Sequence, residues 1–175
     1  SDIPYAGLSF TALGDSKDTS KRELALVEIA KFAWNSKDVV SQEILDIDAV
    51  MQLVATGVSK SKKYAIADIS DNVNGGSAGD STHVIAPLLN LGLKVLTTIC
   101  DPAAVETLDG VKISETIDLS LGGYSHPVVG TPLNVCAQLM WRGNGEYIHE
   151  GVMNHGASYS IGKAAWVRVG TVDIL

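Results

Sequence analysis

The residue types best suited to chemistry are concentrated between residues 68 and 83. Three glycines there would let the backbone approach a ligand closely. The carboxylates of Asp68, Asp71 and Asp80 could orient a substrate amine or support a metal that is held elsewhere. The segment follows an apolar stretch of strand type and precedes one of helical length, which is where open α/β folds place their sites. We therefore take residues 70–82 as the candidate functional loop.

Two known ligand-binding loops are excluded by the residue types at their defining positions. A phosphate-binding loop needs Lys after its last glycine, but Gly79 is followed by Asp80. A calcium-binding EF-hand needs Asp at its first position and Glu at its twelfth, and these positions hold Ser70 and Ser81. A purely structural interpretation stays open, in which Asp80 caps the next helix and the asparagines of the loop form turns.

The histidines and cysteines form no compact ligand pattern. No two histidines have the HExxH spacing, so we expect no complete zinc site within this chain. The nearest approach to a cluster is His149-Glu150 with His155, which is more typical of a polar surface between strands. Cys100 and Cys136 lie in apolar runs, and we expect both to be reduced, buried thiols.

The composition favours a folded domain and argues against two classes of partner. A chain of 175 residues that is 46% hydrophobic can form a substantial core. The net charge of -7, with no basic patch beyond residues 60–63, argues against nucleic acid. No apolar run approaches the ~20 residues that span a membrane, and no leader is visible, so we expect a cytoplasmic protein.

The ends of the chain have the character of a fragment. The sequence starts without Met, runs almost at once into an apolar stretch, and stops in mid-pattern at Leu175. Natural domain ends are usually polar and mobile. We therefore expect a piece of a larger protein, whose exposed apolar surface promotes self-association into a homo-oligomer.

The first half of the sequence predicts helices and a parallel pair of strands. A strand is expected at residues 6–13, followed by a helix whose apolar side chains, Trp34 among them, pack into a core. A second helix is expected from Ile47 to Thr56, with Gly57 as its C-terminal cap. A strand at residues 64–69, a helix at 82–91 and a strand at 94–100 would make a right-handed βαβ crossover. Asp101-Pro102 is expected to open a further short helix.

The second half predicts antiparallel strands. Residues 112–121 alternate, with the apolar side chains on one face. Residues 133–141 and 146–149 are expected to pair around an Asn-Gly turn, and residues 157–161 to pair with 164–169. We therefore predict an α/β (α+β) fold in one domain, residues 1–175, with a βαβ core and flanking helices followed by antiparallel strands and hairpins.

One family resemblance covers most of the chain. The segment Ala67–Thr82 resembles the "AD-x-x-DNPGGG-x-GD-x-T" hallmark of the microcystinase C (MlrC-like) metallopeptidases. Val73 stands where the family usually has Pro, and Asn74 where it often has the first of three glycines. Three further stretches agree in the same order: Asp101–Val105, Leu119–Gly123 followed by Pro127 and Gly130–Leu133, and His149–Gly151. Asp2–Gly7 and Gly14-Asp15 resemble the family's sequence before this domain.

The resemblance implies a site in the glycine-rich loop. The family's motif positions correspond in this chain to Asp71, Asn72, Gly75, Gly76, Gly79 and Asp80. His83 follows them, in what would be the first turn of the next helix. We accordingly predict catalytic roles for Asp71 and Asp80, and substrate-binding roles for Asn72, Gly75, Gly76, Gly79 and His83.

The resemblance also implies a zinc-dependent hydrolase that acts on a peptide-like or small amide substrate. In such an enzyme a metal-bound water attacks the amide carbonyl. In that family the metal ligands lie in an N-terminal domain of the same chain, which would be the partner of this region. The region itself would line the cleft and would not hydrolyse anything alone. Two alternatives stay open: a non-catalytic binding or assembly module, and an independent small-molecule enzyme that uses Asp71, Asp80 and His83.

Overall fold

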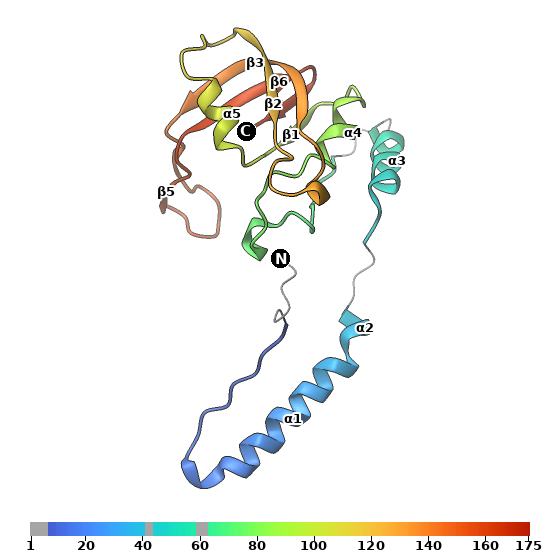
Figure 1. Ribbon diagram of the computed structural model, residues 1–175, viewed down its shortest axis with the longest axis vertical. Helices are drawn as coiled ribbons and strands as arrows, with labels where there is room; N and C mark the ends of the chain where they lie inside the picture. Colours follow the sequence, from blue (N-terminus) through green and yellow to red (C-terminus); the bar gives the residue numbers. More distant parts are fainter. Residues whose placement is uncertain (1–6, 41–43, 59–62) are drawn as a thin grey trace. The chain divides into compact units, whose positions relative to one another are not determined.

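The computed structural model describes residues 7–40, 44–58 and 63–175 (Figure 1). Its internal contacts divide the chain into two units, Ser1–Asp46 and Ile47–Leu175, and each unit is described by itself. The expectation that residues 1–175 form a single domain stays a prediction.

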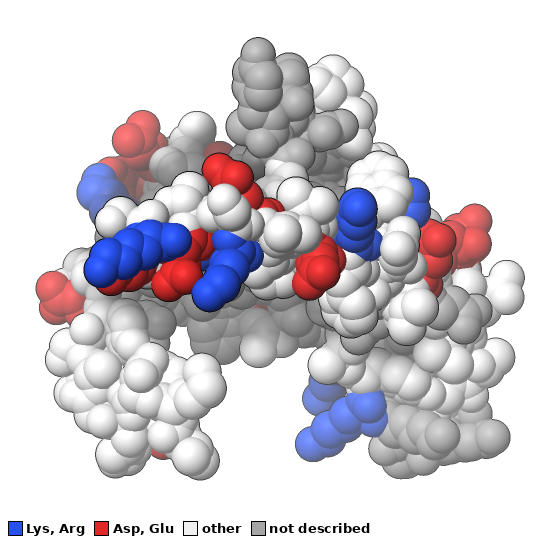
Figure 2. Space-filling view, turned by 90° about the horizontal axis from the view of Figure 1, so that it is seen from below, with Lys and Arg blue, Asp and Glu red and all other residues white. Residues whose placement is uncertain are grey.

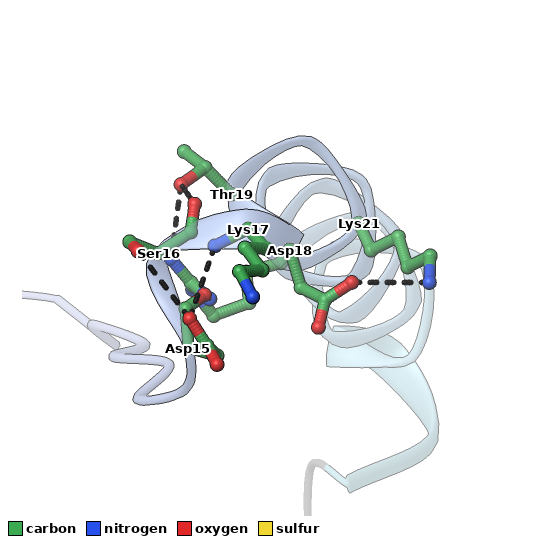
Figure 3. Close-up of polar contacts among 7 residues, drawn as sticks. Asp15, Ser16, Lys17, Asp18, Thr19 and Lys21 are labelled. Carbon is green, nitrogen blue, oxygen red and sulfur yellow. Dashed lines mark hydrogen bonds and ion pairs between the residues drawn. The ribbon is translucent and has the colours of Figure 1, made fainter.

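The first unit is built around one long helix. Its elements are η1 (Ser16–Asp18), α1 (Thr19–Asn35) and α2 (Lys37–Val40). The side chain of Asp15 accepts a hydrogen bond from the Lys17 amide at 3.3 Å, and Asp18 pairs with Lys21 at 3.1 Å (Figure 3). Asp15 thus caps η1, the short turn that leads directly into α1.

Two expectations for the first unit are wrong. The described part of the expected strand, residues 7–13, forms no strand. The helix itself is confirmed, but no residue of α1 is buried, so the core packing expected of its apolar side chains does not occur. Trp34 is 69% exposed, and the ammonium group of Lys37 lies 4.3 Å from the centre of its ring.

The second unit contains a five-stranded sheet in the order β1-β7-β6-β3-β2, and a separate two-stranded sheet, β4-β5. Strands β1 and β7 run parallel, and the other neighbours are antiparallel. The helical elements are α3 (Ile47–Val58), η2 (Val73–Gly75), α4 (Ile85–Leu89), α5 (Pro102–Thr107) and η3 (Pro127–Val129). The strands are β1 (Val95–Thr97), β2 (Thr116–Leu121), β3 (Leu133–Gly143), β4 (Glu146–Ile148), β5 (Ser158–Ser160), β6 (Ala164–Val169) and β7 (Val172–Ile174).

The core of the second unit lies on one face of the five-stranded sheet. Alternate residues of β2, β3, β6 and β7 are buried there, as the period of two in a strand requires. Leu108, just after α5, and Ile85 of α4 join this cluster. The predicted alternation in β2 is confirmed, because Leu119 and Leu121 are buried while Asp118 is exposed.

The α/β class is confirmed, although several local expectations are corrected. Residues 64–69 form no strand, so the parallel partner of β1 is β7. Helix α4 has five residues and is shorter than expected. Helix α3 runs to Val58, so Gly57 lies inside the helix and is not its C-terminal cap. The Tyr64 ring packs against Gly57, where a side chain would collide with it.

The antiparallel strands form where the sequence places them but pair differently. Strand β3 is paired with β2 on one side and with β6 on the other, so β4 is left to pair with β5. Neither expected hairpin therefore forms. Cys100 and Cys136 are free, as expected of reduced thiols, but both are exposed, so the expectation of buried thiols is wrong.

No helix in the described part of the chain is long and apolar enough to cross a membrane. On the face drawn in Figure 2, Lys and Arg side chains alternate with Asp and Glu side chains.

We expect the sheet core to dominate the stability of the second unit. Leu139 of β3 is 0% exposed and lies beside Val167 of β6, so Leu139→Ala should lower the free energy of unfolding by about 3 kcal/mol through lost burial and a residual cavity. The matched variant Leu96→Ala removes the same atoms from a side chain that is 78% exposed, and should change it by less than about 0.5 kcal/mol. Urea denaturation measures both, and equal losses would contradict this account of the core.

Candidate functional site

A cleft of about 740 Å³ lies at the carboxyl ends of the two parallel strands. Residues 97–102, which end β1 and open α5, form one part of its lining, and Leu175 after β7 forms another. The glycine-rich loop contributes Asp71, Asn72, Val73 and Gly79. The strand that the sequence predicts before this loop does not form, and the loop lies instead beside the carboxyl end of β1.

Asp71 holds the loop closed through both of its carboxylate oxygens. Oδ1 accepts a hydrogen bond from the Gly79 amide at 2.9 Å, and Oδ2 accepts one from the Ser81 amide at 2.7 Å. Asn72 caps η2, because its side chain accepts a hydrogen bond from the Asn74 amide at 3.0 Å. Hydrogen bonds from a backbone amide to a carboxylate are stronger than neutral ones. The loop therefore has a defined shape despite its glycine content.

Gly79 is the glycine that the geometry of the loop requires most. Its φ is +79°, and a Cβ atom there would lie 2.7 Å from Val73 Cγ1 and 3.2 Å from Cys100 Cβ. Its carbonyl accepts a hydrogen bond from the Cys100 amide at 2.7 Å. The loop is thus seated directly on the residue that follows β1, and any side chain at position 79 would push the two segments apart.

Asp80 is buried behind the loop and does not line the cleft. The residue is 5% exposed, and its carboxylate accepts hydrogen bonds from the amides of Tyr124 and Ser125 at 2.9 and 2.8 Å and from Ser125 Oγ at 2.5 Å. Its carbonyl accepts one from the Gly123 amide at 2.7 Å. Asp80 therefore joins two loops that are more than 40 residues apart in sequence, and it is not the N-cap of α4, which begins after Val84.

Burial alone would raise the pKa of Asp80. The hydrogen bonds from the Ser125 side chain and from the Ser125 and Tyr124 amides outweigh this effect and hold the pKa below its ordinary value of 3.8. The carboxylate thus stays ionised in the folded protein at neutral pH.

Thr82 and His83 continue the same contact between loops. Thr82 donates its amide to the Val129 carbonyl at 2.9 Å and its hydroxyl to the Thr131 carbonyl at 2.9 Å. His83 Nε2 lies 2.7 Å from the Val128 carbonyl, so this nitrogen carries the proton that it donates. The His83 side chain is exposed and is not part of the cleft lining.

The predicted site residues therefore fall into two groups. Asp71, Asn72 and Gly79 line the cleft, whereas Asp80, His83, Gly75 and Gly76 do not. Their functional roles stay predictions.

Asp101 lines the cleft as well, but the sequence predicts only that it opens a helix. It does cap α5, because Oδ1 accepts the Ala104 amide at 2.9 Å. Its Oδ2 accepts the Gly122 amide at 2.8 Å, which fixes the start of α5 to the end of β2. The Asp-Pro pair signals the cap, while nothing in the sequence signals the second contact.

The described residues contain no group of three or more His, Cys, Asp or Glu side chains that could hold a metal ion. His149 packs edge-on against Tyr159, with ring centres 6.0 Å apart, and His155 Nδ1 lies 3.2 Å from the Glu150 carbonyl. The two histidines expected to come nearest to a cluster are thus engaged separately.

Comparison with known proteins identifies the region that carries this geometry. The family described as MlrC C-terminus matches residues 66–175. A crystal structure of a candidate metallopeptidase from Mesorhizobium sp. BNC1 is similar, with a TM-score of 0.71 and 22% sequence identity over 86% of this chain. This chain spans 30% of the length of that protein. No curated protein matches the chain in sequence.

We expect the Asp80 contacts to give a pH-dependent contribution to stability. Asp80→Asn places an amide group among three hydrogen-bond donors and should lower the free energy of unfolding at pH 7 by about 2 kcal/mol. Because the folded-state pKa is lowered, the carboxylate stabilises the fold above pH 3.8, and this contribution is lost as the pH falls through the folded-state pKa. The difference between variant and parent should therefore shrink below pH 3.8 in chemical denaturation.

Asp118→Asn is the matched control, because Asp118 is exposed on β2. It should change the free energy of unfolding by less than about 0.5 kcal/mol at pH 7. An Asp80→Asn effect no larger than this, or one that is constant from pH 7 to pH 3, would show that the buried carboxylate is not stabilising.

Proposed function

We propose that this chain, which belongs to the MlrC C-terminus family, lines the substrate cleft of a zinc-dependent amide or peptide hydrolase. The observation that carries the proposal is the cleft at the carboxyl ends of β1 and β7, one wall of which is the loop that bears the family's motif. Open α/β folds bind ligands at this place. The similarity to the Mesorhizobium protein supports the fold on which the argument is built.

The residues of the cleft do not fit a complete zinc centre. Asp71 and Asp101 each have both carboxylate oxygens engaged by backbone amides of this chain. A zinc site needs three or four converging ligands, and the described residues offer no such group. We propose that the metal is bound by a different part of a longer polypeptide, an N-terminal domain, which faces this cleft.

In this proposal the chain binds and orients the substrate. The apolar side chains of the cleft exclude water from the bound amide, while the loop presents a rigid edge against which the substrate is positioned. Asp71 acts through the loop that it closes, and Asp80 acts through the contact between the loop and residues 122–125. Both are then positioning residues, because neither has been placed against a reacting atom.

Zinc content and amide hydrolysis, measured on the 175-residue chain and on a longer polypeptide that includes the N-terminal domain, test the proposal. We expect about one zinc per chain and chelator-sensitive hydrolysis in the longer polypeptide, and neither in the 175-residue chain, because the metal ligands lie outside it. Absence of zinc and activity from both would favour a non-catalytic binding or assembly module. Activity of the 175-residue chain alone would favour an independent enzyme.

The loop can be tested with a pair of glycine substitutions in the longer polypeptide. Gly79→Ala introduces a Cβ atom at a φ of +79° and 2.7 Å from Val73 Cγ1, so it should displace the loop and lower kcat/KM at least tenfold. Gly7→Ala is the matched control, because no described atom lies within 4 Å of a Cβ atom there and Gly7 lies outside the loop. It should leave kcat/KM within about twofold of the parent. Equal effects of the two substitutions would argue against the loop as a wall of the catalytic cleft.

A further inference from the structure

We infer that the cleft recognises a short zwitterionic amide, with a free ammonium group held by Asp68, a free carboxylate held by Lys163 and an apolar body between them. The inference rests on the proposed function, because it names the class of substrate for the same cleft. The observation behind it is that some charged groups of the lining are not fully used in contacts within the protein.

Asp68 has a carboxylate oxygen with no partner in the described part of the chain. Its Oδ1 accepts a hydrogen bond from the Ser70 amide at 3.0 Å, and no described residue donates to Oδ2. The other two carboxylates of the lining, Asp71 and Asp101, each accept backbone amides at both oxygens. Asp68 is therefore the carboxylate of the cleft that can receive a ligand's proton donor.

The surroundings of Asp68 favour an ammonium group over a metal ion. Its neighbours Ile66 and Ile69 also line the cleft and are apolar. A metal ion would need further ligands near Asp68, and the described residues contain no group of three. An ammonium group can instead be held by one carboxylate oxygen, with its other protons directed to water or to carbonyl groups.

Among the described residues that line the cleft, Lys163 alone carries a positive charge. It lies on the turn before β6, and its ammonium group pairs with Asp109 Oδ2 at 2.9 Å. Both side chains of this pair are exposed, and Asp109 is not part of the lining. Exposed ion pairs contribute little to stability, so a ligand carboxylate can share Lys163 or replace Asp109 as its partner.

The rest of the lining is suited to an apolar body. Aliphatic side chains come from the segment before the loop, from α4, from the end of β1, from α5 and from the last residue: Ile66, Ile69, Ile85, Ile99, Val105 and Leu175. The volume of about 740 Å³ lies within the range of small-molecule sites. Burial of apolar side chains would supply the affinity, and the two charges would fix the direction in which the ligand lies.

Binding of matched dipeptides to the 175-residue chain tests the inference by isothermal titration calorimetry. The probes are leucyl-leucine, N-acetyl-leucyl-leucine, which lacks the ammonium group, and leucyl-leucinamide, which lacks the carboxylate. We expect leucyl-leucine to bind at least about fivefold more tightly than either capped peptide, because each capped peptide forfeits one charge-assisted hydrogen bond.

Each charged residue has a probe that should report on it alone. Asp68→Asn should abolish the preference for leucyl-leucine over the acetylated peptide and leave the preference over the amide unchanged. Lys163→Met should abolish the preference for leucyl-leucine over leucyl-leucinamide and leave the preference over the acetylated peptide unchanged. Lys163→Arg should retain both preferences, because it keeps the positive charge. Asp109→Asn removes the competing partner of Lys163, so it should tighten the binding of leucyl-leucine while leaving leucyl-leucinamide unchanged.

Circular dichroism of each variant confirms that it folds, as expected for side chains outside the core. Equal binding of the three probes by the parent chain, binding of none of them, or preferences that survive Asp68→Asn and Lys163→Met would overturn the inference. Such results would leave the proposed function standing wherever the longer polypeptide binds zinc and hydrolyses an amide. Loss of that activity with the preferences intact would instead overturn the proposed function and leave a binding cleft.

Discussion

The site depends on carboxylates that bind the protein's own backbone. Asp80 receives three hydrogen bonds from residues 124 and 125, Asp71 closes the glycine-rich loop, and Asp101 fixes the start of α5 to the end of β2. Charge-assisted hydrogen bonds of this kind are worth more in a partly buried setting than in water. They give irregular segments a fixed shape beside a sheet whose edge strand, β1, has only three residues.

This arrangement decides which groups are left for a ligand. A carboxylate that accepts two backbone amides is held in place and partly neutralised by their dipoles, so it is a poor partner for a substrate charge. The cleft therefore presents few free charges although several acidic residues line it. We infer that recognition then falls to Asp68 and Lys163 and to the aliphatic side chains of the lining.

The sequence predicts the local elements of this protein better than their partners. The cap at Asp101, the alternation in β2 and the positions of the later strands follow from local patterns, and all are confirmed. Strand pairing is decided by long-range contacts, and the expected hairpins fail because β3 is already paired on both sides. The apolar spacing of α1 indicates a helix but not a buried one, since periodicity alone does not show what covers a face. The role of Asp80 cannot be predicted from local patterns either, because its hydrogen-bond partners lie 44 and 45 residues away in the sequence.

The departures of this loop from the family's motif are compatible with the same backbone. Asn72 has an extended conformation, with φ of -77° and ψ of 109°, which is the conformation that a following Pro would impose. Val73 is the first residue of η2, a position that Pro also suits. Asn74 is not among the residues with positive φ, so a glycine is not needed there, whereas Gly76 and Gly79 do have positive φ. The residues that differ from the motif are thus those whose backbone tolerates a side chain, and Gly79, where a Cβ atom would collide with Val73, is kept.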